Sequence, residues 1–513
     1  MLQAIDLTIT LNQNLRVLLE RFTFTLQPGD RAVIIGEEGN GKSTLLALLY
    51  DEALVRDYAS YTGSIRRDGM RLGYLYQELP AAALGQTVYE YLYEHGAFDS
   101  ADPKALAAIA HELRVPEELL YADQPLAALS GGEKVKVQMV RLLAAGPDAL
   151  LLDEPTNDID IETLEWLEQF LLRCPLPVLY VSHDETLIER TANRVVHIEQ
   201  VRKKTTPRHT IANLPYAVYL DQRRRTLAHD EQVARKERED YADQMARWQK
   251  IHDEVERQQA TITRQNPSGA RLLKKKMKSV LSQQRRYERE KEDFTPIPEV
   301  EDAIFASFGQ VQVPNGKEIL RFALPALTIG DRVLATGIEL QASGPAHIGI
   351  IGRNGVGKTT LLRRIAEALL ARTDLKAAYM PQNYWERLDP AQSPVDYLAP
   401  SGRKDDVTRA RTYLGSLKYR RDEMTQPIAA LSGGQKAKLL LLKMILDGCN
   451  VLVLDEPTRN FSPLSGPVVR GLLASFGGAI LSVTHDRKYL REVCDTVYRL
   501  ESDGLHRVYR TEE

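Results

Sequence analysis

The sequence is poor in cysteine and has no long apolar runs. Its 513 residues include three cysteines, Cys174, Cys449 and Cys494, which lie far apart and form neither CxxC nor Cys/His spacing. We therefore expect buried structural thiols rather than a metal framework. The longest apolar stretches, such as Leu439–Leu442, fall far short of the roughly 20 residues that span a bilayer, so no membrane segment is expected.

A secretory signal and a strong net charge are also missing. The N-terminus, Met1-Leu2-Gln3-Ala4-Ile5-Asp6, has no basic region followed by an apolar one, which favours a cytoplasmic protein. The net charge is -3, so the whole surface gives no sign of a nucleic-acid partner, and any basic surface must be local. Hydrophobic residues make up 43% and charged residues 27%, as in globular proteins, and the length suggests about three units.

Two glycine-rich loops stand in the same local context. The first, Gly36-Glu37-Glu38-Gly39-Asn40-Gly41-Lys42-Ser43, follows an apolar run and precedes a helix-forming one. The second, Gly352-Arg353-Asn354-Gly355-Val356-Gly357-Lys358-Thr359, does the same. In such loops backbone N–H groups point at phosphate oxygens, the lysine reaches the β- and γ-phosphates, and the next hydroxyl can ligate Mg²⁺. The loops therefore predict two phosphate sites.

The landmarks downstream of each loop repeat with the same spacing. In both copies an acid lies 23 residues after the serine of a Leu-Ser-Gly-Gly sequence, at Asp153 and at Asp455. A histidine follows 30 residues later, at His183 and at His485. This match indicates two copies of one domain. Apolar β-type runs alternate with helical runs, which predicts a mainly parallel sheet covered by helices.

The residue types at these landmarks suit phosphate chemistry. Each Asp ends an apolar strand, which places its carboxylate at the sheet edge where Mg²⁺ would bind. The next residues, Glu154 and Glu456, are then in position to orient or deprotonate an attacking water. A lone His after a strand is more often structural, but recurrence at one offset favours a functional His183 and His485. Each Ser-Gly-Gly leads into a helix-forming run, so it predicts a helix N-terminus that offers amides to phosphate.

Together these motifs resemble the nucleotide-binding domain of the ATP-binding cassette (ABC) family over about four-fifths of the chain. The resemblance implies an α/β fold with two P-loop cassette domains, a Mg²⁺-dependent ATPase, and a monomer that pairs its two cassettes internally. It implies catalytic roles for Glu154, His183, Glu456 and His485. It implies metal ligation by Ser43, Gln77, Asp153, Thr359, Gln382 and Asp455. Besides both loops, it implies ATP contacts from Thr44, Gln77, Ser130, Gly131, Gly132, Glu133, Thr360, Gln382, Ser432, Gly433, Gly434 and Gln435.

In this family each signature completes the site of the opposite cassette. The resemblance thus implies that Ser432–Gln435 close over ATP on Lys42, and that Ser130–Glu133 close over ATP on Lys358, so that ATP joins the halves and hydrolysis releases them. Two features depart from the pattern. The loop after the second acid pair, 457–463, lacks the acids of the first, which suggests either unequal turnover or a harmless variant. No aromatic residue upstream of either loop is placed to stack on adenine.

The segment between the two copies has a different character. Large or apolar residues recur at alternating intervals of four and three positions, which is the heptad pattern of a coiled-coil seam. They are Tyr241, Met245, Trp248, His252, Val255, Gln259 and Ile262, and then Leu273, Met277, Val280, Gln284 and Tyr287. Between the two runs, Pro267 and Gly269 are unfavourable inside a helix, so we expect the chain to reverse at 266–269 into an antiparallel helical hairpin.

Positive charge concentrates near the reversal. Residues 264–289 hold nine Lys/Arg and one acid, whereas residues 221–257 hold nine Lys/Arg and ten acids. Charge runs are usually solvated faces, but a near-neutral protein with a basic projecting tip favours contact with phosphates. With few aromatic residues there, recognition of the backbone and shape of folded RNA is favoured over base stacking. The candidate RNA-binding residues are Arg264, Arg271, Lys274, Lys275, Lys276 and Lys278.

Twin cassettes joined by such a hairpin resemble the ABC-F family, whose members bind the ribosome at the E site. The resemblance implies cassettes over 1–200 and 301–513, a hairpin linker over 201–300, and contact with rRNA and the P-site tRNA. It leaves two roles open: a general translation factor, or a protection factor that dislodges antibiotics. Other classes of ABC protein remain alternatives, namely the energy module of a transporter and a DNA-associated ABC ATPase.

Overall fold

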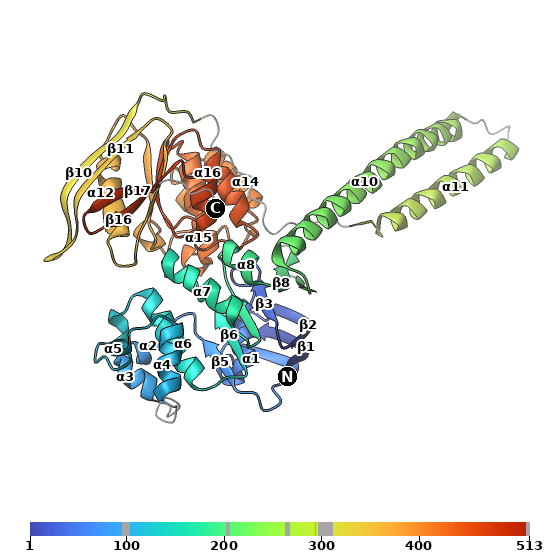
Figure 1. The fold of residues 1–513 in the computed structure, drawn as a ribbon. Helices are drawn as coiled ribbons and strands as arrows, with labels where there is room; N and C mark the ends of the chain where they lie inside the picture. The colour runs from blue at the N-terminus through green and yellow to red at the C-terminus, as the bar shows by residue number, and fades with distance from the viewer. Residues whose placement is uncertain (95–102, 202–205, 262–266, 293, 296–310, 509–513) are drawn as a thin grey trace. The chain divides into compact units, whose positions relative to one another are not determined.

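The computed structural model describes residues 1–94, 103–201, 206–261, 267–292, 294–295 and 311–508 (Figure 1). It divides into two compact units. One unit comprises Met1–Tyr216 together with Glu301–Glu513, and the other comprises Ala217–Val300. Residues 1–216 and 311–508 of the first unit are called the N-terminal and C-terminal halves below.

The N-terminal half alternates strands and helices as the sequence predicts. Its strands are β1 (Leu2–Leu11), β2 (Val17–Leu26), β3 (Arg31–Ile35), β4 (Ala59–Arg66), β5 (Leu72–Leu75), β6 (Ala149–Asp153), β7 (Val178–Val181), β8 (Arg194–Gln200) and β9 (Thr206–Ala212). Its α-helices are α1 (Lys42–Tyr50), α2 (Ala81–Leu84), α3 (Val88–Tyr93), α4 (Pro103–Glu112), α5 (Glu117–Leu120), α6 (Gly131–Ala144), α7 (Ile161–Arg173) and α8 (Glu185–Thr191).

The C-terminal half repeats this arrangement. Its strands are β10 (Glu318–Ile329), β11 (Arg332–Ser343), β12 (His347–Ile351), β13 (Ala377–Met380), β14 (Val451–Asp455), β15 (Ala479–Val483), β16 (Thr496–Glu501) and β17 (Gly504–Val508). Its α-helices are α12 (Lys358–Leu370), α13 (Pro394–Leu398), α14 (Lys404–Ser416), α15 (Gly433–Leu446), α16 (Gly466–Ala474) and α17 (Arg487–Glu492).

A six-stranded, mainly parallel sheet organises each half, which confirms the predicted fold class. The strand orders are β5-β6-β7-β3-β8-β9 and β13-β14-β15-β12-β16-β17, and only the last pair of each sheet is antiparallel. The central strands β6 and β14 are buried at every position, as expected for strands covered on both faces. Because both sheets place β6 and β14 next to β7 and β15, the acids and the histidines end neighbouring strands.

Antiparallel strands supplement each sheet. The N-terminal half has a second sheet, β2-β1-β4, and β10 pairs with β11 in a long two-stranded ribbon (Figure 1). The antiparallel pairing of β8 with β9 carries the N-terminal sheet to Ala212. The domain boundaries at residues 200 and 300 stay predictions, while the division into compact units falls after Tyr216.

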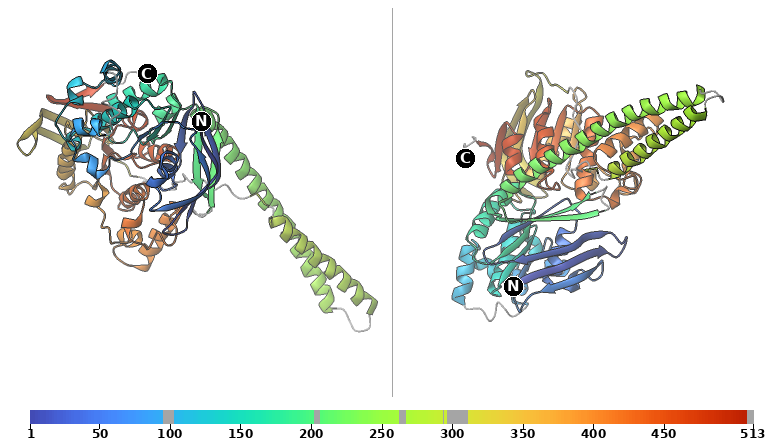
Figure 2. Two further views of the ribbon diagram at one scale, coloured as in Figure 1. Left: turned by 90° about the horizontal axis from the view of Figure 1, so that it is seen from below. Right: turned by 90° about the vertical axis from the view of Figure 1, so that its right-hand side faces the viewer.

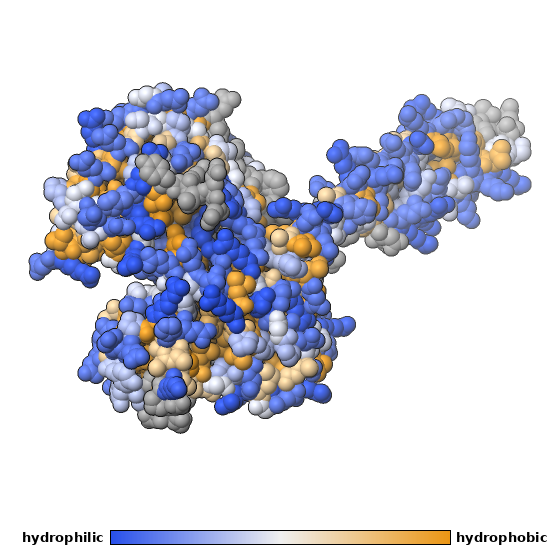
Figure 3. All heavy atoms as spheres, in the orientation of Figure 1, coloured by the Kyte–Doolittle hydropathy of each residue, from blue (hydrophilic) through white to orange (hydrophobic). Residues whose placement is uncertain are grey.

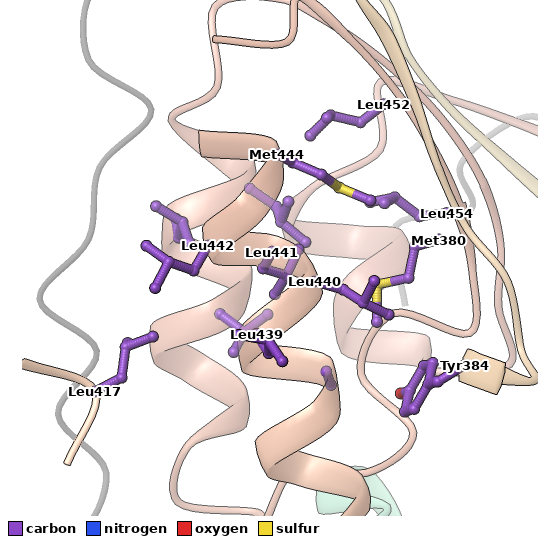
Figure 4. Packing of buried hydrophobic residues seen from close by; sticks show 14 of the residues in the cluster. Met380, Tyr384, Leu417, Leu439, Leu440, Leu441, Leu442, Met444, Leu452 and Leu454 are labelled. Atoms are coloured by element: carbon purple, nitrogen blue, oxygen red, sulfur yellow. The ribbon is translucent and has the colours of Figure 1, made fainter. Parts of the chain in front are cut away.

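Helix α15, which begins at the second signature, is packed into an apolar core. Leu439, Leu440, Leu441 and Leu442 are all buried, and Met444 lies beside Leu454 of β14 (Figure 4). This core fixes the helix direction and therefore the position of its N-terminus. Of the cysteines, Cys449 and Cys494 are buried, whereas Cys174 is only partly buried; all three are free thiols.

The unit Ala217–Val300 contains a helical hairpin, as predicted. Helices α10 (Tyr216–Thr261) and α11 (Pro267–Glu292) run side by side (Figure 2). The Trp248 indole N–H donates to the Val280 carbonyl at 2.8 Å, and the Gln259 side chain donates to the Leu273 carbonyl at 3.1 Å. The earlier residue of α10 bonds to the later residue of α11 and the later to the earlier, which is the antiparallel arrangement.

Burial along the hairpin follows the predicted seam. Val255, Trp248 and Val280 are buried, while the lysines of α11 are exposed. One detail of the prediction was wrong. Pro267 and Gly269 do not interrupt the helices but lie in the first turn of α11, where proline lacks only an N–H that has no intrahelical partner. Residues 262–266, which include seam residue Ile262 and candidate RNA ligand Arg264, lie outside the described residues.

The seam can be tested by charge placement. We expect Val255→Asp, which puts a carboxylate at a fully buried position, to open the hairpin and accelerate tryptic cleavage within 217–300 about tenfold. The matched variant Ile251→Asp changes a 43% exposed residue of the same helix and should be cleaved like the unmodified chain. Equal cleavage rates for the two variants would contradict the packing described here.

Candidate nucleotide sites

Each glycine loop crosses from a buried strand to a helix N-terminus. The last glycine before the lysine, Gly41 or Gly357, caps the following helix in the left-handed conformation, with φ of 91° and 102°. That conformation suits glycine, and it turns successive N–H groups inward. Lys42 donates to the carbonyls of its own loop at 2.9 and 3.2 Å, and Lys358 does so at 2.8 and 2.9 Å. Both lysines are therefore held at the centre of a cradle suited to phosphate.

The acids at the ends of β6 and β14 are buried beside the lysines of the phosphate loops. Burial raises the pKa of Asp153 and of Asp455 to about 6. The Ser43 hydroxyl donates to Asp153 at 2.9 Å, and both carboxylate oxygens of Asp455 are buried with no hydrogen-bond partner among the described residues. A hydroxyl and a buried carboxylate are ligands that Mg²⁺ prefers, so the donor set fits that ion.

Both following glutamates are held in an uncommon backbone conformation. Glu154 and Glu456 have φ of 49° and 50°, the left-handed region that non-glycine residues seldom adopt outside constrained sites. Burial favours the neutral form of Glu154, but the charges of His183 and Lys42 lower its pKa below the ordinary value. Burial, reinforced by the Asp455 charge, raises the pKa of Glu456 to about 8. The two sites therefore shift the pKa of their glutamates in opposite directions.

The two histidines also differ in their partners. His183 Nε2 lies 2.9 Å from a Glu154 carboxylate oxygen, and its Nδ1 lies 2.9 Å from the carbonyl of Phe461 in the opposite half. His485 Nε2 lies 3.6 Å from Glu456, and within the described residues its buried Nδ1 has no hydrogen-bond partner. Burial lowers the pKa of His485 to about 4, so it is neutral.

A cleft around Lys358 is lined by both halves. It brings together Ser130, Gly131, Glu133, Asp158 and His183 of the N-terminal half with Lys358, Thr359, Thr360, Gln382, Asp455, Glu456 and His485 of the C-terminal half. The first signature, at the N-terminus of α6, thus faces the second phosphate loop. Ile329, Arg332 and Val333 of the β10–β11 ribbon line the same cleft. The sequence has no aromatic residue upstream of the second phosphate loop that is placed to stack on adenine. Aliphatic side chains and an arginine line the cleft there instead.

The second signature faces the first phosphate loop. The Gly434 N–H, at the N-terminus of α15, donates to Glu38 Oε2 at 2.7 Å. The neighbouring Glu37 accepts from the hydroxyls of Ser462 and Ser465 at 3.2 and 3.0 Å. In both directions a signature helix therefore begins against the loop of the other half.

Buried ion pairs join α8 of the N-terminal half to α16 and α17 of the C-terminal half. The Arg470 guanidinium, before β15, donates to both carboxylate oxygens of Glu185 in α8 at 2.6 and 3.1 Å, and both side chains are buried. Lys488 of α17 lies 3.1 Å from the same glutamate. Removing one partner of such a pair leaves an uncompensated charge and costs about 3–5 kcal/mol. The contact between the halves is thus specific as well as extensive.

Not every predicted residue joins these clusters. Gln77 follows β5 but is exposed, while its counterpart Gln382 lines the Lys358 cleft and lies 3.5 Å from Asp158. The contacts of Phe461, Ser462 and Arg470 with the opposite half were not predicted. One sequence difference could have indicated such contacts between the halves. Acidic Glu37 and Glu38 of the first glycine loop align with Arg353 and Asn354 of the second.

Comparison with known proteins agrees with this geometry. The family model described as "ABC transporter" matches residues 19–157 and 335–459, together just over half of the chain. The two matched segments each contain a phosphate loop, a signature and an acid pair. Among the helices within the described ranges, none is both long and apolar enough to cross a bilayer.

Several curated bacterial proteins align with nearly the whole chain. "Probable ATP-binding protein YheS" of Escherichia coli (strain K12) is 29% identical over 96% of this chain and 77% of its own length. "Uncharacterized ABC transporter ATP-binding protein YfmR" of Bacillus subtilis is 27% identical over 96% and 80%. "ATP-binding protein Uup" of Haemophilus influenzae is 26% identical over 95% and 77%.

Solved structures share the fold at low sequence identity. The archaeal ribosome recycling factor aABCE1, in its complex with the stalk protein aP1, superposes with a TM-score of 0.59 at 16% identity, covering 98% of this chain and 89% of that chain. A model of ribosome-bound archaeal Pelota and ABCE1 gives 0.55 at 17% identity, covering 98% and 78%. With two matched cassettes, tandem-cassette relatives and this common fold, the chain belongs to the ATP-binding cassette family and is an ATPase of the ABC-F type.

Proposed function

We propose that the two clusters are ATP sites that each require both halves. Lys42 and Lys358 would hold the β- and γ-phosphates, and the signature amides of the opposite half would hold the terminal phosphate. Glu154 and Glu456 would orient the attacking water, and His183 and His485 would lie against the terminal phosphate. The crossing of each signature to the opposite loop supports this assignment.

Magnesium would be held by Asp153 with Ser43 and by Asp455 with Thr359, with Gln77 and Gln382 adjacent. Bound there, the ion would neutralise phosphate charge. The buried, unpartnered carboxylate of Asp455 supports this assignment.

The catalytic glutamates give the first test of this proposal. We expect Glu154→Gln combined with Glu456→Gln to lower ATP turnover about 100-fold, because the amide cannot accept the proton of the attacking water. ATP binding should persist, since the phosphate ligands are intact. Glu339→Gln, an exposed change on β11, serves as the control. Turnover within twofold of the unmodified chain in the double variant would exclude these glutamates.

The target is proposed from the hairpin. We propose that the ATP-closed protein binds the ribosome and that the basic end of the hairpin contacts rRNA and the P-site tRNA. The names of the structural neighbours, a ribosome recycling factor and a ribosome-bound complex, are consistent with such a partner. A ribosomal target also implies a cytoplasmic protein.

One observation carries this proposal: the charge on α11 is exposed. Arg271, Lys274, Lys275, Lys276 and Lys278 are all exposed, and no carboxylate of the described residues forms an ion pair with them. By contrast, Arg286 further along α11 pairs with Glu290 at 2.8 Å. Hydrophilic residues cover much of the visible face of both helices (Figure 3). Unpaired cations on a helix end suit the phosphates of folded RNA.

Co-sedimentation tests the partner. The variant carrying Glu154→Gln and Glu456→Gln should hold ATP without releasing it by hydrolysis, so we expect it to co-sediment with ribosomes in bacterial lysates in ATP, and at least about tenfold less in ADP. Recovery with membranes or DNA instead would reject the ribosomal proposal. It would favour the transporter or the DNA-associated alternative.

Charge reversal tests the hairpin. Changing Lys274, Lys275, Lys276 and Lys278 to Glu should weaken ribosome binding at least about tenfold and flatten its dependence on salt, since phosphate contacts release counterions. ATP binding should be unchanged. The matched control reverses four exposed cations of α10, namely Arg224, Lys236, Arg247 and Lys250. An equal loss in both variants, or none in the first, would contradict a specific basic tip.

Growth of a drug-sensitive host separates the two roles. A protection factor should raise resistance to antibiotics of the large ribosomal subunit, and the Lys→Glu variant should abolish that gain. A general translation factor should leave drug sensitivity unchanged.

A further inference from the structure

The two phosphate loops present opposite charges to the opposite half. At the positions of Glu37 and Glu38 in the first loop, the second loop has Arg353 and Asn354. Arg353 pairs with Glu162 at 3.2 Å, and the Asn354 side-chain amide donates to the Asp158 carbonyl. The acidic segment 157–162 therefore meets a basic and an amide residue at the Lys358 site.

At the Lys42 site the acidic residues belong to the phosphate loop rather than to the opposite half. Glu37 accepts from the hydroxyls of Ser462 and Ser465, and Lys438 of α15 lies 3.7 Å from its carboxylate. Segment 457–463, which contains Ser462, has no acid. An acid in this segment would lie beside Glu37 and repel it. The acid-free second loop is thus the electrostatic complement of the acidic first phosphate loop.

Glu38 occupies the place of an anion at the start of α15. Its Oε2 accepts from the Gly434 N–H at 2.7 Å, and a Cβ built on Gly433 would lie 3.0 and 3.2 Å from its two carboxylate oxygens. The N-terminus of this 14-residue helix is the anion-binding element that the ATP-site assignment gives to the terminal phosphate. A carboxylate and a terminal phosphate cannot both take the same N–H and the same positive end of the helix dipole.

We propose that Glu38 is a built-in competitor of the terminal phosphate at the Lys42 site. The site therefore discriminates weakly between ATP and ADP, whereas the Lys358 site, with neutral Asn354 at the matching position, selects ATP. This inference rests on the ATP sites proposed above and is independent of the ribosomal target. Glu38 is exposed to solvent, so a nucleotide displaces it at modest cost and the Lys42 site stays able to bind.

The affinity ratio of one site tests the proposal. In the full chain carrying Lys358→Ala and Glu154→Gln, only the Lys42 site holds phosphate, and ATP is not turned over there. Calorimetry with Mg·ATP and with Mg·ADP then gives two dissociation constants. We expect Glu38→Asn to tighten ATP binding about tenfold and to change ADP binding less than twofold, because ADP has no phosphate at the α15 N-terminus.

Two matched variants separate competition from a general charge effect. Glu20→Gln removes one exposed charge from β2 of the same half, outside the phosphate loop, and it should change the ratio of ATP to ADP affinity less than twofold. The reciprocal change Asn354→Glu, in a chain carrying Lys42→Ala and Glu456→Gln, should weaken ATP binding at the Lys358 site about tenfold and spare ADP.

Three results would overturn the inference. One is an unchanged ATP affinity in Glu38→Asn. Another is an equal change for ATP and ADP, which would make Glu38 merely structural. The third is no binding of either nucleotide in the Lys358→Ala chain, which would also reject the Lys42 site itself, while leaving the ribosome assay to be judged separately.

Discussion

The structure depends on one contact made twice: the N-terminus of a signature helix lies against the phosphate loop of the other half. A helix start concentrates unpaired N–H groups and partial positive charge, and it favours an anion in front of it. Each half alone leaves its helix start facing solvent and its phosphate loop open on one side. An anion that binds the helix start of one half and the phosphate loop of the other therefore links the two halves. Its binding free energy also stabilises the closed arrangement of the halves.

The two copies of this contact are not equivalent. At one, Asp158 meets Asn354 and Glu162 meets Arg353, and the cleft around Lys358 lies between the halves. At the other, Glu38 already occupies the helix start. The two histidines also differ in their contacts with the opposite half. His183 Nδ1 lies against the Phe461 carbonyl, whereas His485 Nδ1 has no hydrogen-bond partner among the described residues. The two copies thus differ in sequence at the surface where they meet.

Local features of the sequence were sufficient for the architecture of each half. Strand, glycine loop and helix are adjacent in sequence, so the places of Lys42 and Lys358 followed from short-range physics. Asp153 and Asp455 were placed at strand ends for the same reason. The seam of the hairpin was found from its spacing, and only the position of Pro267 was wrong, because a first helical turn tolerates proline.

Contacts across the halves could not be found in this way. Arg470 and Glu185 are 285 residues apart, and nothing local to either predicts a buried bidentate pair. Glu38 is an ordinary loop acid in sequence, and only the proximity of Gly434 gives it a partner. The left-handed conformation of Glu154 and Glu456 is likewise imposed by the surrounding structure rather than by the residue type.

The central claim is that nucleotide draws the two halves together. The most direct test is the distance between two spin labels, one at exposed Glu118 of the N-terminal half and one at exposed Arg411 of the C-terminal half. The labelled chain also carries Glu154→Gln and Glu456→Gln, which prevent ATP turnover, and Cys174→Ser, which removes a partly exposed thiol. The account predicts one narrow, short distance distribution with Mg·ATP and a longer or broader one with Mg·ADP. Identical distributions in the two nucleotides would contradict it.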